Sequence, residues 1–294
     1  MNAWRDPHDD SPADILLETT PLFERKQHGA PSVFRPENML REARRQKAIN
    51  SGIVPPICVI DPDGDIVSHV RRRFAASLCE NWACYHTRMW EWTAGNISCG
   101  IIGQVVGGSF SVLVAEQLFA SGCQLLVNLA SAGQITDLGP PPYYILVERA
   151  LRDEGTSYHY LPPCPYAEAD PALIRLAVCA FGSVGYPVHR GATWTTDAPF
   201  RETAEAIESR RRRGILAVEM EAAALYAFAA ACARPVICLA HVSNQLGCRE
   251  GDFEKGEGNG AAGSLDLVMA LAAAWARRPG AVLAGDAVRF STSP

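Results

Sequence analysis

The sequence lacks an excess of positive charge and any long apolar run. Its 294 residues carry a net charge of −5, which provides no basic surface for nucleic acid. The longest apolar candidate, residues 267–276, is well short of the roughly 20 residues that a membrane-spanning helix needs. The N-terminal residues contain no apolar core of a secretory signal. We therefore expect a cytoplasmic protein that binds neither nucleic acid nor membranes.

The sequence also lacks a disulfide or metal-binding pattern of cysteines. Its ten cysteines are scattered, and none forms a Cys-x-x-Cys pair. Several lie within apolar runs, where a free thiol behaves as a small hydrophobic side chain. These are Cys58, Cys123, Cys179 and Cys238. We expect reduced thiols, no metal site and no redox motif.

Composition divides the chain into an extension, one domain and a tail. Residues 1–50 are polar and charge-rich, and they predict an N-terminal extension that is partly helical, at residues 39–48. Residues 51–280 alternate short apolar strands with helices, and residues 281–294 form a C-terminal tail. The alternation predicts a single α/β domain with a mixed, mostly parallel central sheet flanked by helices.

Polar clusters follow several of the predicted strands. In sheets of this kind, ligands bind outside the carboxyl ends of the strands. The convergence of these clusters therefore indicates one ligand site. The clusters are residues 61–65, 103–109, 131–133, 195–197, 219–221 and 243–244.

Two acidic residues stand where a short apolar strand meets an Ala-rich helix, within residues 214–226. Glu219 and Glu221 flank Met220, and burying either charge is costly unless a partner pairs with it. One interpretation makes both acids helix N-terminal residues that the macrodipole stabilises. The other places them at an open site or in specific hydrogen bonds. The local pattern leaves both interpretations open.

A glycine-rich turn, residues 103–109, leads into another predicted helix. Gly107 and Gly108 would let backbone N–H groups and the helix N-terminus face an anion such as phosphate. The turn has neither the Gly-Lys-Ser/Thr of a P-loop nor the Gly-x-Gly-x-x-Gly of a dinucleotide site. Because tight turns also use glycine, the turn alone does not define a phosphate site.

Together these segments resemble the nucleoside phosphorylase family, which includes purine and uridine phosphorylases and the related methylthioadenosine and AMP nucleosidases. The resemblance covers about residues 56–276. Its most specific part is Val-Glu-Met-Glu-Ala-Ala-Ala-Leu-Tyr at residues 218–226, which is similar to the family's ribose-binding signature. The other similar segments are residues 103–109, 128–133, 195–200 and 242–244.

The resemblance implies a role for each segment. Glu221 would bind the ribose hydroxyls, which suits the two acceptor oxygens of a carboxylate. Met220 would pack against the sugar, and Glu219 would lie close to the sugar or the base. The residues implied on the phosphate or nucleophile side are Gly107, Gly108, Ser131 and Arg88.

The base would contact the segment that follows the strand ending near Thr195. Phe200 and Pro199 lie where the family places a base-stacking aromatic residue, and Trp194 is a second candidate. Thr195 and Asp197 belong to the same implied base-binding segment.

Asn244 departs from the family pattern, because purine enzymes carry at this place an aspartate that protonates the purine. The resemblance still implies a catalytic position for Asn244. An amide can hydrogen-bond a 6-oxopurine or a pyrimidine, both donating and accepting. The substitution therefore disfavours adenosine as the substrate.

The phosphate site departs from the family pattern as well. The family places an arginine after the first strand, and residues 60–64 contain none. A second family arginine is missing from residues 128–131. Both losses remove the usual bidentate grip on phosphate. Three cations are candidates to replace these two arginines. They are Arg88, as an arginine supplied to a neighbouring subunit, and the loop residues Arg249 and Lys255.

Water is the alternative nucleophile. Nucleosidases of the family carry a carboxylate after the first strand as the base that activates water, and Asp65 or Asp63 lies near that position. A carboxylate within hydrogen-bond reach of a water can act in this way. The same residues also suit a plain turn with an N-capping aspartate.

The resemblance therefore implies cleavage of the N-glycosidic bond of a small nucleoside-like molecule by phosphorolysis, with phosphate as co-substrate and no cofactor. The alternatives are a nucleoside hydrolase and a catalytically inactive nucleoside-binding protein. Family members assemble as dimers, trimers or hexamers, so a homo-oligomer is expected.

Overall fold

The computed structural model describes residues 20–24, 26–246 and 250–278. The predicted tail, residues 281–294, and residues 1–19 of the predicted extension lie outside these ranges. The strands are β1 (Ile57–Asp61), β2 (Ser77–Leu78), β3 (Met89–Ala94), β4 (Ile97–Gly103), β5 (Leu125–Gln134), β6 (Tyr143–Asp153), β7 (Tyr166–Glu168), β8 (Val188–Thr196), β9 (Ile215–Glu219) and β10 (Val236–Asn244). The helices are α2 (Pro36–Lys47), α3 (Asp65–Arg73), α4 (Gly108–Ala120), α5 (Pro171–Phe181), α6 (Ala204–Arg212), α7 (Ala222–Cys232) and α8 (Ala261–Ala276), with short 3₁₀ turns η1 (Thr156–His159), η2 (Pro199–Arg201) and η3 (Glu257–Gly260).

Part of the sheet closes on itself. β5 pairs with β10, β10 with β6, β6 with β8, β8 with β9, and β9 returns to β5. β1, β4, β3 and β2 continue outward from β5 as an open extension. Because β5 belongs to both parts, its carboxyl end lies where the closed ring and the extension meet.

The domain is an α/β fold with a mixed sheet flanked by helices, as predicted. Among the described strands, β1–β4, β1–β5, β5–β10, β6–β8 and β8–β9 pair in parallel, and the other pairings are antiparallel. The sheet is thus more evenly mixed than the mostly parallel arrangement expected. The difference arises because β6 runs antiparallel to β10, and β9 meets the last residues of β5 in antiparallel fashion.

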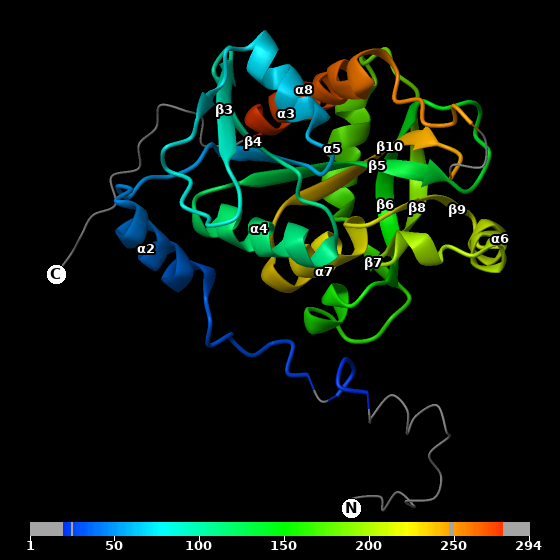
Figure 1. Cartoon of the computed structure of the whole chain (residues 1–294), viewed down its shortest axis with the longest axis horizontal. Coiled ribbons are helices and arrows are strands. Elements are labelled where there is room, and N and C mark those ends of the chain that lie inside the picture. The colour runs from blue at the N-terminus through cyan, green and yellow to red at the C-terminus, as the bar shows by residue number, and fades with distance from the viewer. Residues whose placement is uncertain (1–19, 25, 247–249, 279–294) are drawn as a thin grey trace, which may run out of the picture.

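Helices cover the sheet from opposite sides. α4 and α7 pack together on one side, α3 and α8 lie together on the other, and α5 packs against α8 (Figure 1). The first two turns of α7, residues 222–228, are buried throughout. This burial explains why the Ala-rich helix has no polar face.

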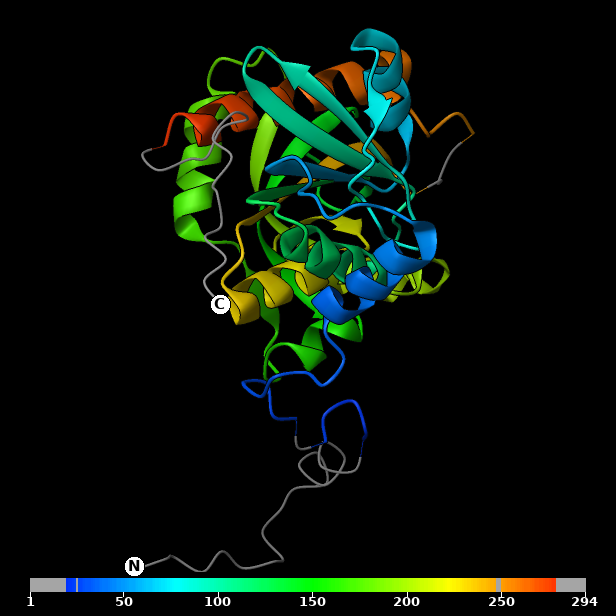
Figure 2. The same ribbon diagram turned by 90° about the vertical axis from the view of Figure 1, so that its left-hand side faces the viewer.

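The described part of the extension packs one helix onto the domain. α2 begins at Pro36, as suits a proline in the first turn, and covers nearly the stretch predicted to be helical. Leu40 and Ala43 of this helix pack with Ala83, and Ala120 at the end of α4 lies against them. The described residues before it, 20–24 and 26–35, run without helix or strand toward η1 (Figure 2).

None of the helices in the described ranges is long and apolar enough to cross a membrane. The nine cysteines that the structure describes are free thiols, and Cys58 and Cys238 are buried in the core as small side chains.

Candidate active site at the strand ends

The carboxyl ends of β1, β4, β5 and β9 meet at one place. The backbone N–H of Gly107, which follows β4, donates to Glu221, which follows β9, at 2.7 Å. The Ser131 hydroxyl on β5 donates to Asp63, which follows β1, at 3.1 Å. The charge of Asp63 also contributes to the raised pKa of Glu221, so the two contacts belong to one cluster. The predicted convergence of strand ends is therefore present for these residues.

Glu221 is a buried carboxylate with few partners. It is 2% exposed, and its two oxygens accept from the backbone N–H groups of Gly107 and Met220, at 2.7 and 3.3 Å. Burial, with the neighbouring charge of Glu219, raises the pKa of Glu221 to about 8. Both hydrogen bonds favour the ionised form and oppose this shift. Glu221 therefore combines a high desolvation cost with unused acceptor positions.

Glu219, by contrast, accepts hydrogen bonds from four donors within the protein. One oxygen accepts from the hydroxyls of Thr193 and Thr195, at 3.1 and 2.5 Å. The other accepts from the backbone N–H groups of Glu221 and Ala222, at 2.8 and 2.7 Å. Glu219 thus closes the first turn of α7, as the helix-capping interpretation expects. The two interpretations of the acidic pair apply to different residues.

Thr195 and Asp197 of the implied base segment both hold backbone in place. The Thr195 hydroxyl, which donates to Glu219, accepts from the N–H of Ala223 at 2.9 Å. Asp197 is exposed, and its carboxylate accepts from the N–H of Gly155 at 2.8 Å. The segment is thereby tied to α7 on one side and to the end of β6 on the other.

Trp194 lies away from this cluster, contrary to its expected role as a base-stacking residue. Thr193 and Thr195 point toward Glu219, so the alternation of a strand directs Trp194 to the other face. Its ring is 3% exposed in a small apolar cluster, and its indole N–H donates to Asp153 at 2.9 Å. The ring is thus occupied by packing.

Phe200 and Pro199 lie at the outer rim, in η2. Phe200 is 99% exposed, so its ring has no protein contact that would fix it in place. Met220 is partly exposed between the two buried glutamates. The structure leaves the faces of both side chains open to a ligand.

Asn244 is buried at the end of β10. Its amide nitrogen lies 3.4 Å from the Ala132 carbonyl and 3.3 Å from the Ser243 hydroxyl, and its oxygen accepts from the N–H of Leu246 at 3.0 Å. The side chain therefore turns the chain out of β10 next to β5.

Three acids after β1 have different partners. Asp61 is buried, its carboxylate accepts from the N–H of Val67 at 2.9 Å, and burial raises its pKa to about 7. Asp63 and Asp65 both accept from the ammonium of Lys255, each at 2.8 Å. Only Asp61 thus serves the turn, as the plain-turn interpretation expects.

Lys255 joins the loop before α8 to the β1 turn. Burial lowers its pKa, but the two aspartates outweigh burial and hold the pKa above the ordinary value. Asn259 adds a bond to Asp65 at 3.0 Å. Burial raises the pKa of Asp65, and the bonds from Lys255 and Asn259 outweigh it, so the net shift is downward. Lys255 was one of the cations predicted from the sequence, whereas no sequence signal marked Asn259.

His241 on β10 faces the same loop. Its ring stacks on Tyr144, with centroids 4.7 Å apart and planes 19° from parallel. Burial, with the charge of Lys255, lowers the pKa of His241 to about 4. The imidazole is therefore neutral near pH 7 and packs as a core side chain.

Two buried charged residues at the end of β6, Arg152 and Glu154, were not predicted from the sequence. Arg152 donates to the carbonyls of Leu161 and Pro162, at 3.1 and 2.7 Å. Glu154 accepts from the N–H of Ser157 and lies beside Gly108 at the start of α4. The polar run after an apolar strand was the available signal, the same one that marked the other strand ends.

Arg88 lines a groove beside the aspartates. The groove measures about 610 Å³ and is bordered by Asp63, Asp65, Arg71 and Phe110 as well as Arg88. The Arg71 guanidinium lies over the Trp90 ring, 3.9 Å from its centroid. Arg249, the other cation expected to replace the family arginines, lies outside the described residues.

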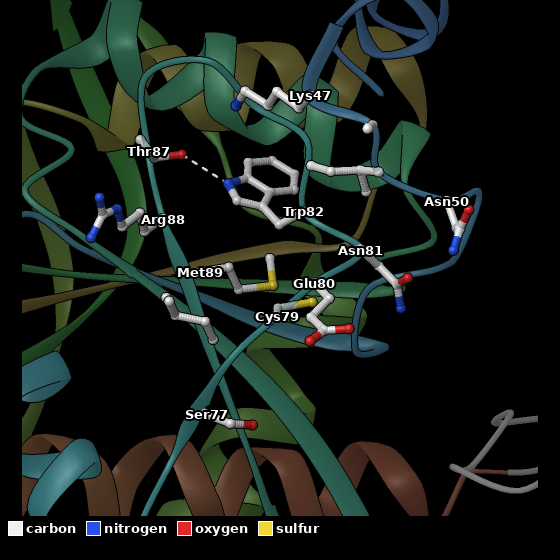
Figure 3. Close-up of a pocket in the computed structure, with 13 residues that line it drawn as sticks. Lys47, Asn50, Ser77, Cys79, Glu80, Asn81, Trp82, Thr87, Arg88 and Met89 are labelled. Carbon is white, nitrogen blue, oxygen red and sulfur yellow. Dashed lines mark hydrogen bonds between the residues drawn. The ribbon is translucent and has the colours of Figure 1, made fainter. Parts of the chain in front are cut away.

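A larger hollow lies apart from the strand ends. It measures about 870 Å³ and opens between the C-terminal end of α2 and strands β2 and β3. Figure 3 shows Trp82 at its centre, with the indole N–H donating to Thr87 at 2.9 Å. Lys47 and Arg88 also border the hollow, but neither glutamate of the 218–226 segment does. Size alone therefore does not identify the site.

In the described ranges, no group of three or more His, Cys, Asp and Glu side chains is placed to hold a metal ion.

Known proteins resemble this chain in both sequence and fold. Purine nucleoside phosphorylases of the DeoD type from Colwellia psychrerythraea and a Jannaschia species are 27% and 31% identical to it over 139 residues. Each alignment covers 47% of this chain and 59% of the relative, so the chain spans somewhat over half the length of these proteins.

Solved structures show the same fold. A uridine phosphorylase from Vibrio fischeri, complexed with 6-hydroxy-1-naphthoic acid, superimposes with a TM-score of 0.65 at 19% identity, covering 74% of this chain and 90% of that one. A second structure of the Vibrio fischeri enzyme gives a TM-score of 0.63 at 21% identity. The family model of the phosphorylase superfamily matches residues 56–285, which is most of the sequence. This chain therefore belongs to the phosphorylase superfamily.

Proposed function

We propose that this chain cleaves the N-glycosidic bond of a nucleoside and that Glu221 binds the ribose hydroxyls. The observation that carries the proposal is the contrast between two buried carboxylates. Glu219 accepts from four donors within the protein, whereas Glu221 accepts from two backbone N–H groups. A carboxylate has about four acceptor positions, so Glu221 has about two left unfilled, which two adjacent hydroxyls would occupy.

Glu219 then acts as a positioning residue. Its bonds to the N–H groups of Glu221 and Ala222 fix the turn from which the Glu221 side chain projects. Met220, partly exposed between them, would pack against the sugar. The ribose would thus be bound by Glu221 and Met220 and oriented through Glu219.

The base would lie toward β8 and the end of β6, with Asp197, Glu154 and Asn244 around it. Phe200 and Pro199 at the exposed rim would cover the base once it is bound, because the open ring of Phe200 is free to stack. Thr195 would support this side through its bonds to Glu219 and α7.

Phosphorolysis is the first candidate for the chemical step. Departure of the base leaves an oxocarbenium-like sugar, which a nucleophile on the opposite face must attack. The named phosphorylase relatives and the groove that Arg71 and Arg88 border support phosphate as this nucleophile. The backbone of Gly107 and Gly108 and the Ser131 hydroxyl would complete its site. Phosphate would be the co-substrate, and no cofactor is invoked.

Hydrolysis is the second candidate, because carboxylates stand where phosphate would have to bind. Asp63 bonds to Ser131 and Lys255 and remains 29% exposed, so water reaches it. Asp65 is held by both Lys255 and Asn259. Of the two, Asp63 is the one whose charge acts on Glu221, which favours it as the base that activates water.

A panel of nucleosides assayed with and without phosphate tests these proposals. Phosphorolysis predicts base release only with phosphate, and Arg88→Ala should then raise the KM for phosphate. Hydrolysis predicts release in phosphate-free buffer and a loss of about a hundredfold or more in kcat for Asp63→Asn. Glu205→Gln on exposed α6 is the matched control. Nucleoside binding without base release under either condition would indicate an inactive nucleoside-binding protein instead.

We also propose that the chain assembles as a homo-oligomer of two, three or six copies. The support is the resemblance to the family, together with the exposed Arg88 at the mouth of the groove. Light scattering of the purified protein measures the number of copies, and a monomeric mass would refute this proposal.

A further inference from the structure

We propose that residues 20–24 and 26–28, here named the strap, position residues 153–165, here named the wall loop, which borders the base side of the active site. Phe23 and His28 are the positioning residues of the strap. The inference rests on the proposed function for its effect on substrate. The strap precedes the part of the chain that the superfamily model matches, residues 56–285.

The strap contacts the wall loop at Tyr158 and His159 of η1. The Phe23 ring meets the Tyr158 ring edge to face, with centroids 4.9 Å apart and planes at 88°. The His28 ring donates to the Tyr158 carbonyl at 3.1 Å. The Lys26 ammonium donates to Nδ1 of His159 at 3.1 Å. Three side chains of the strap thus hold two consecutive residues of the wall loop.

Tyr158 passes this contact to Arg152. The Arg152 guanidinium lies over the Tyr158 ring, 4.2 Å from its centroid, and the Tyr158 hydroxyl donates to the Arg152 carbonyl at 3.1 Å. Phe23, Tyr158 and Arg152 therefore form one continuous set of contacts from the strap to the domain.

Arg152 determines the course of the wall loop. Its buried guanidinium donates to the Ser157 hydroxyl at 2.8 Å, to the Leu161 carbonyl at 3.1 Å and to the Pro162 carbonyl at 2.7 Å. Among the described residues, no carboxylate lies within salt-bridge distance of Arg152, so the loop's own oxygens balance the buried charge. A change in the tilt of Tyr158 would therefore move the loop as a unit.

The wall loop reaches the site at its first residues. The Gly155 N–H donates to Asp197, and Glu154 lies beside Gly108 at the start of α4. Gly108 is adjacent to Gly107, whose N–H holds Glu221. Because Asp197 belongs to the proposed base side, loosening the strap should widen that side of the site, while Asp63 and Lys255, which bond to each other, keep their contacts.

The strap can be perturbed without disturbing the core. The residues between it and α2 are exposed, including Val33 at 97% and Phe34 at 72%. Phe23 and His28 are themselves only partly buried. Substitutions there should leave the folded domain intact.

Steady-state kinetics of the full chain test the proposal with Phe23→Ala and His28→Ala. We expect each to raise the KM for the nucleoside by about two- to tenfold, the size of one aromatic or hydrogen-bonded contact, with kcat changed by less than about twofold. Phe23→Tyr keeps the aromatic ring and His28→Gln keeps a hydrogen-bond donor, so both variants should show the wild-type KM. Phe34→Ala is the control, because it removes an aromatic ring of the same extension that is 72% exposed and, unlike Phe23, forms no ring pair with Tyr158.

Amide hydrogen exchange of residues 155–161 gives a readout that does not require turnover. Both alanine variants should speed exchange there, and Phe34→Ala should not. Unchanged exchange would refute the proposal that the strap holds the wall loop. Faster exchange with an unchanged KM would refute the proposal that the strap affects the active site. If the wild type cleaves no nucleoside, the proposed function fails, while the exchange experiment still decides whether the strap holds the loop.

Discussion

Glu219 and Glu221 lie two residues apart, and their different partners give them different tasks. Glu219 is saturated by Thr193, Thr195 and two backbone N–H groups, so it stabilises the start of α7. Glu221 projects from that turn with two backbone donors and a raised pKa. A buried carboxylate with so perturbed a pKa at a cluster of strand ends is a candidate functional residue.

Replacing Glu221 with Gln should impair ribose binding. Above about pH 8, where Glu221 is ionised, the amide keeps the shape but loses the charge that strengthens hydrogen bonds from the sugar hydroxyls. We expect kcat/KM for a ribonucleoside to fall by about ten- to a hundredfold, as for loss of charged hydrogen bonds. The preference over the 2′-deoxynucleoside should shrink at the same time. An equal loss for both substrates would show that Glu221 does not read the hydroxyls; Glu205→Gln is the control.

The pKa of Glu221 also predicts a pH dependence. The ionised carboxylate is the stronger acceptor, so kcat/KM should rise as pH increases through about 8, and Glu221→Gln should lack this rise. The effect on stability has the opposite sign. Between the ordinary glutamate pKa and about 8, the unfolded chain is ionised while the native residue keeps its proton, so stability falls as pH rises. Urea unfolding of both proteins across this range measures that contribution.

At the level of elements, the site depends on the close approach of α4 and α7. A Cβ atom on Gly108 would lie 2.8 Å from the Cβ of Ala224, which is too short for two rigidly held carbons. The glycine therefore lets the start of α4 reach the first turn of α7. This approach brings the Gly107 N–H to Glu221.

Gly108→Ala should force the two helices apart. We expect a loss of about 1–3 kcal/mol in the free energy of unfolding, the usual cost of overpacking. Nucleoside cleavage should fall as well, because the Gly107 N–H moves away from Glu221. Gly185→Ala is the control, since a Cβ there meets nothing within 4 Å. Equal stability of the two variants in urea unfolding would contradict this account.

At the level of the whole molecule, the closed ring of strands is joined to α7 through Tyr226. Its buried hydroxyl donates to the Val147 carbonyl on β6 at 2.6 Å and accepts from the Cys238 N–H on β10 at 3.0 Å. Val147 lies where the register between β6 and β8 shifts. The tyrosine hydroxyl thus links β6, at this irregularity, to β10.

Tyr226→Phe should destabilise the domain without creating a cavity. It leaves one buried carbonyl and one buried N–H unpaired, so we expect a loss of about 1–3 kcal/mol in the free energy of unfolding. Tyr186→Phe, which alters a longer bond to Asp266 at a partly exposed site, is the comparison. A similar loss of stability in both variants would show that the Tyr226 hydroxyl does not stabilise the closed ring of strands.

The sequence alone determined the class of fold and which strand-end residues lie together. Apolar strands alternating with helices set the α/β architecture, because each element must bury one face. The 218–226 segment and the polar strand ends marked residues that the fold brings together, as the bonds from Gly107 to Glu221 and from Ser131 to Asp63 show. These features were readable because they depend on local periodicity and on a short motif.

Only the tertiary structure decided which of these residues are free to act. Hydrogen bonds from another strand saturate Glu219, packing covers Trp194, and Lys255 pairs with aspartates some 190 positions earlier in the chain. The closure of the ring from β9 back to β5 was likewise not predicted. The physical reason is the same in each case: burial and hydrogen-bond saturation depend on neighbours in space, and local sequence spacing does not encode those neighbours.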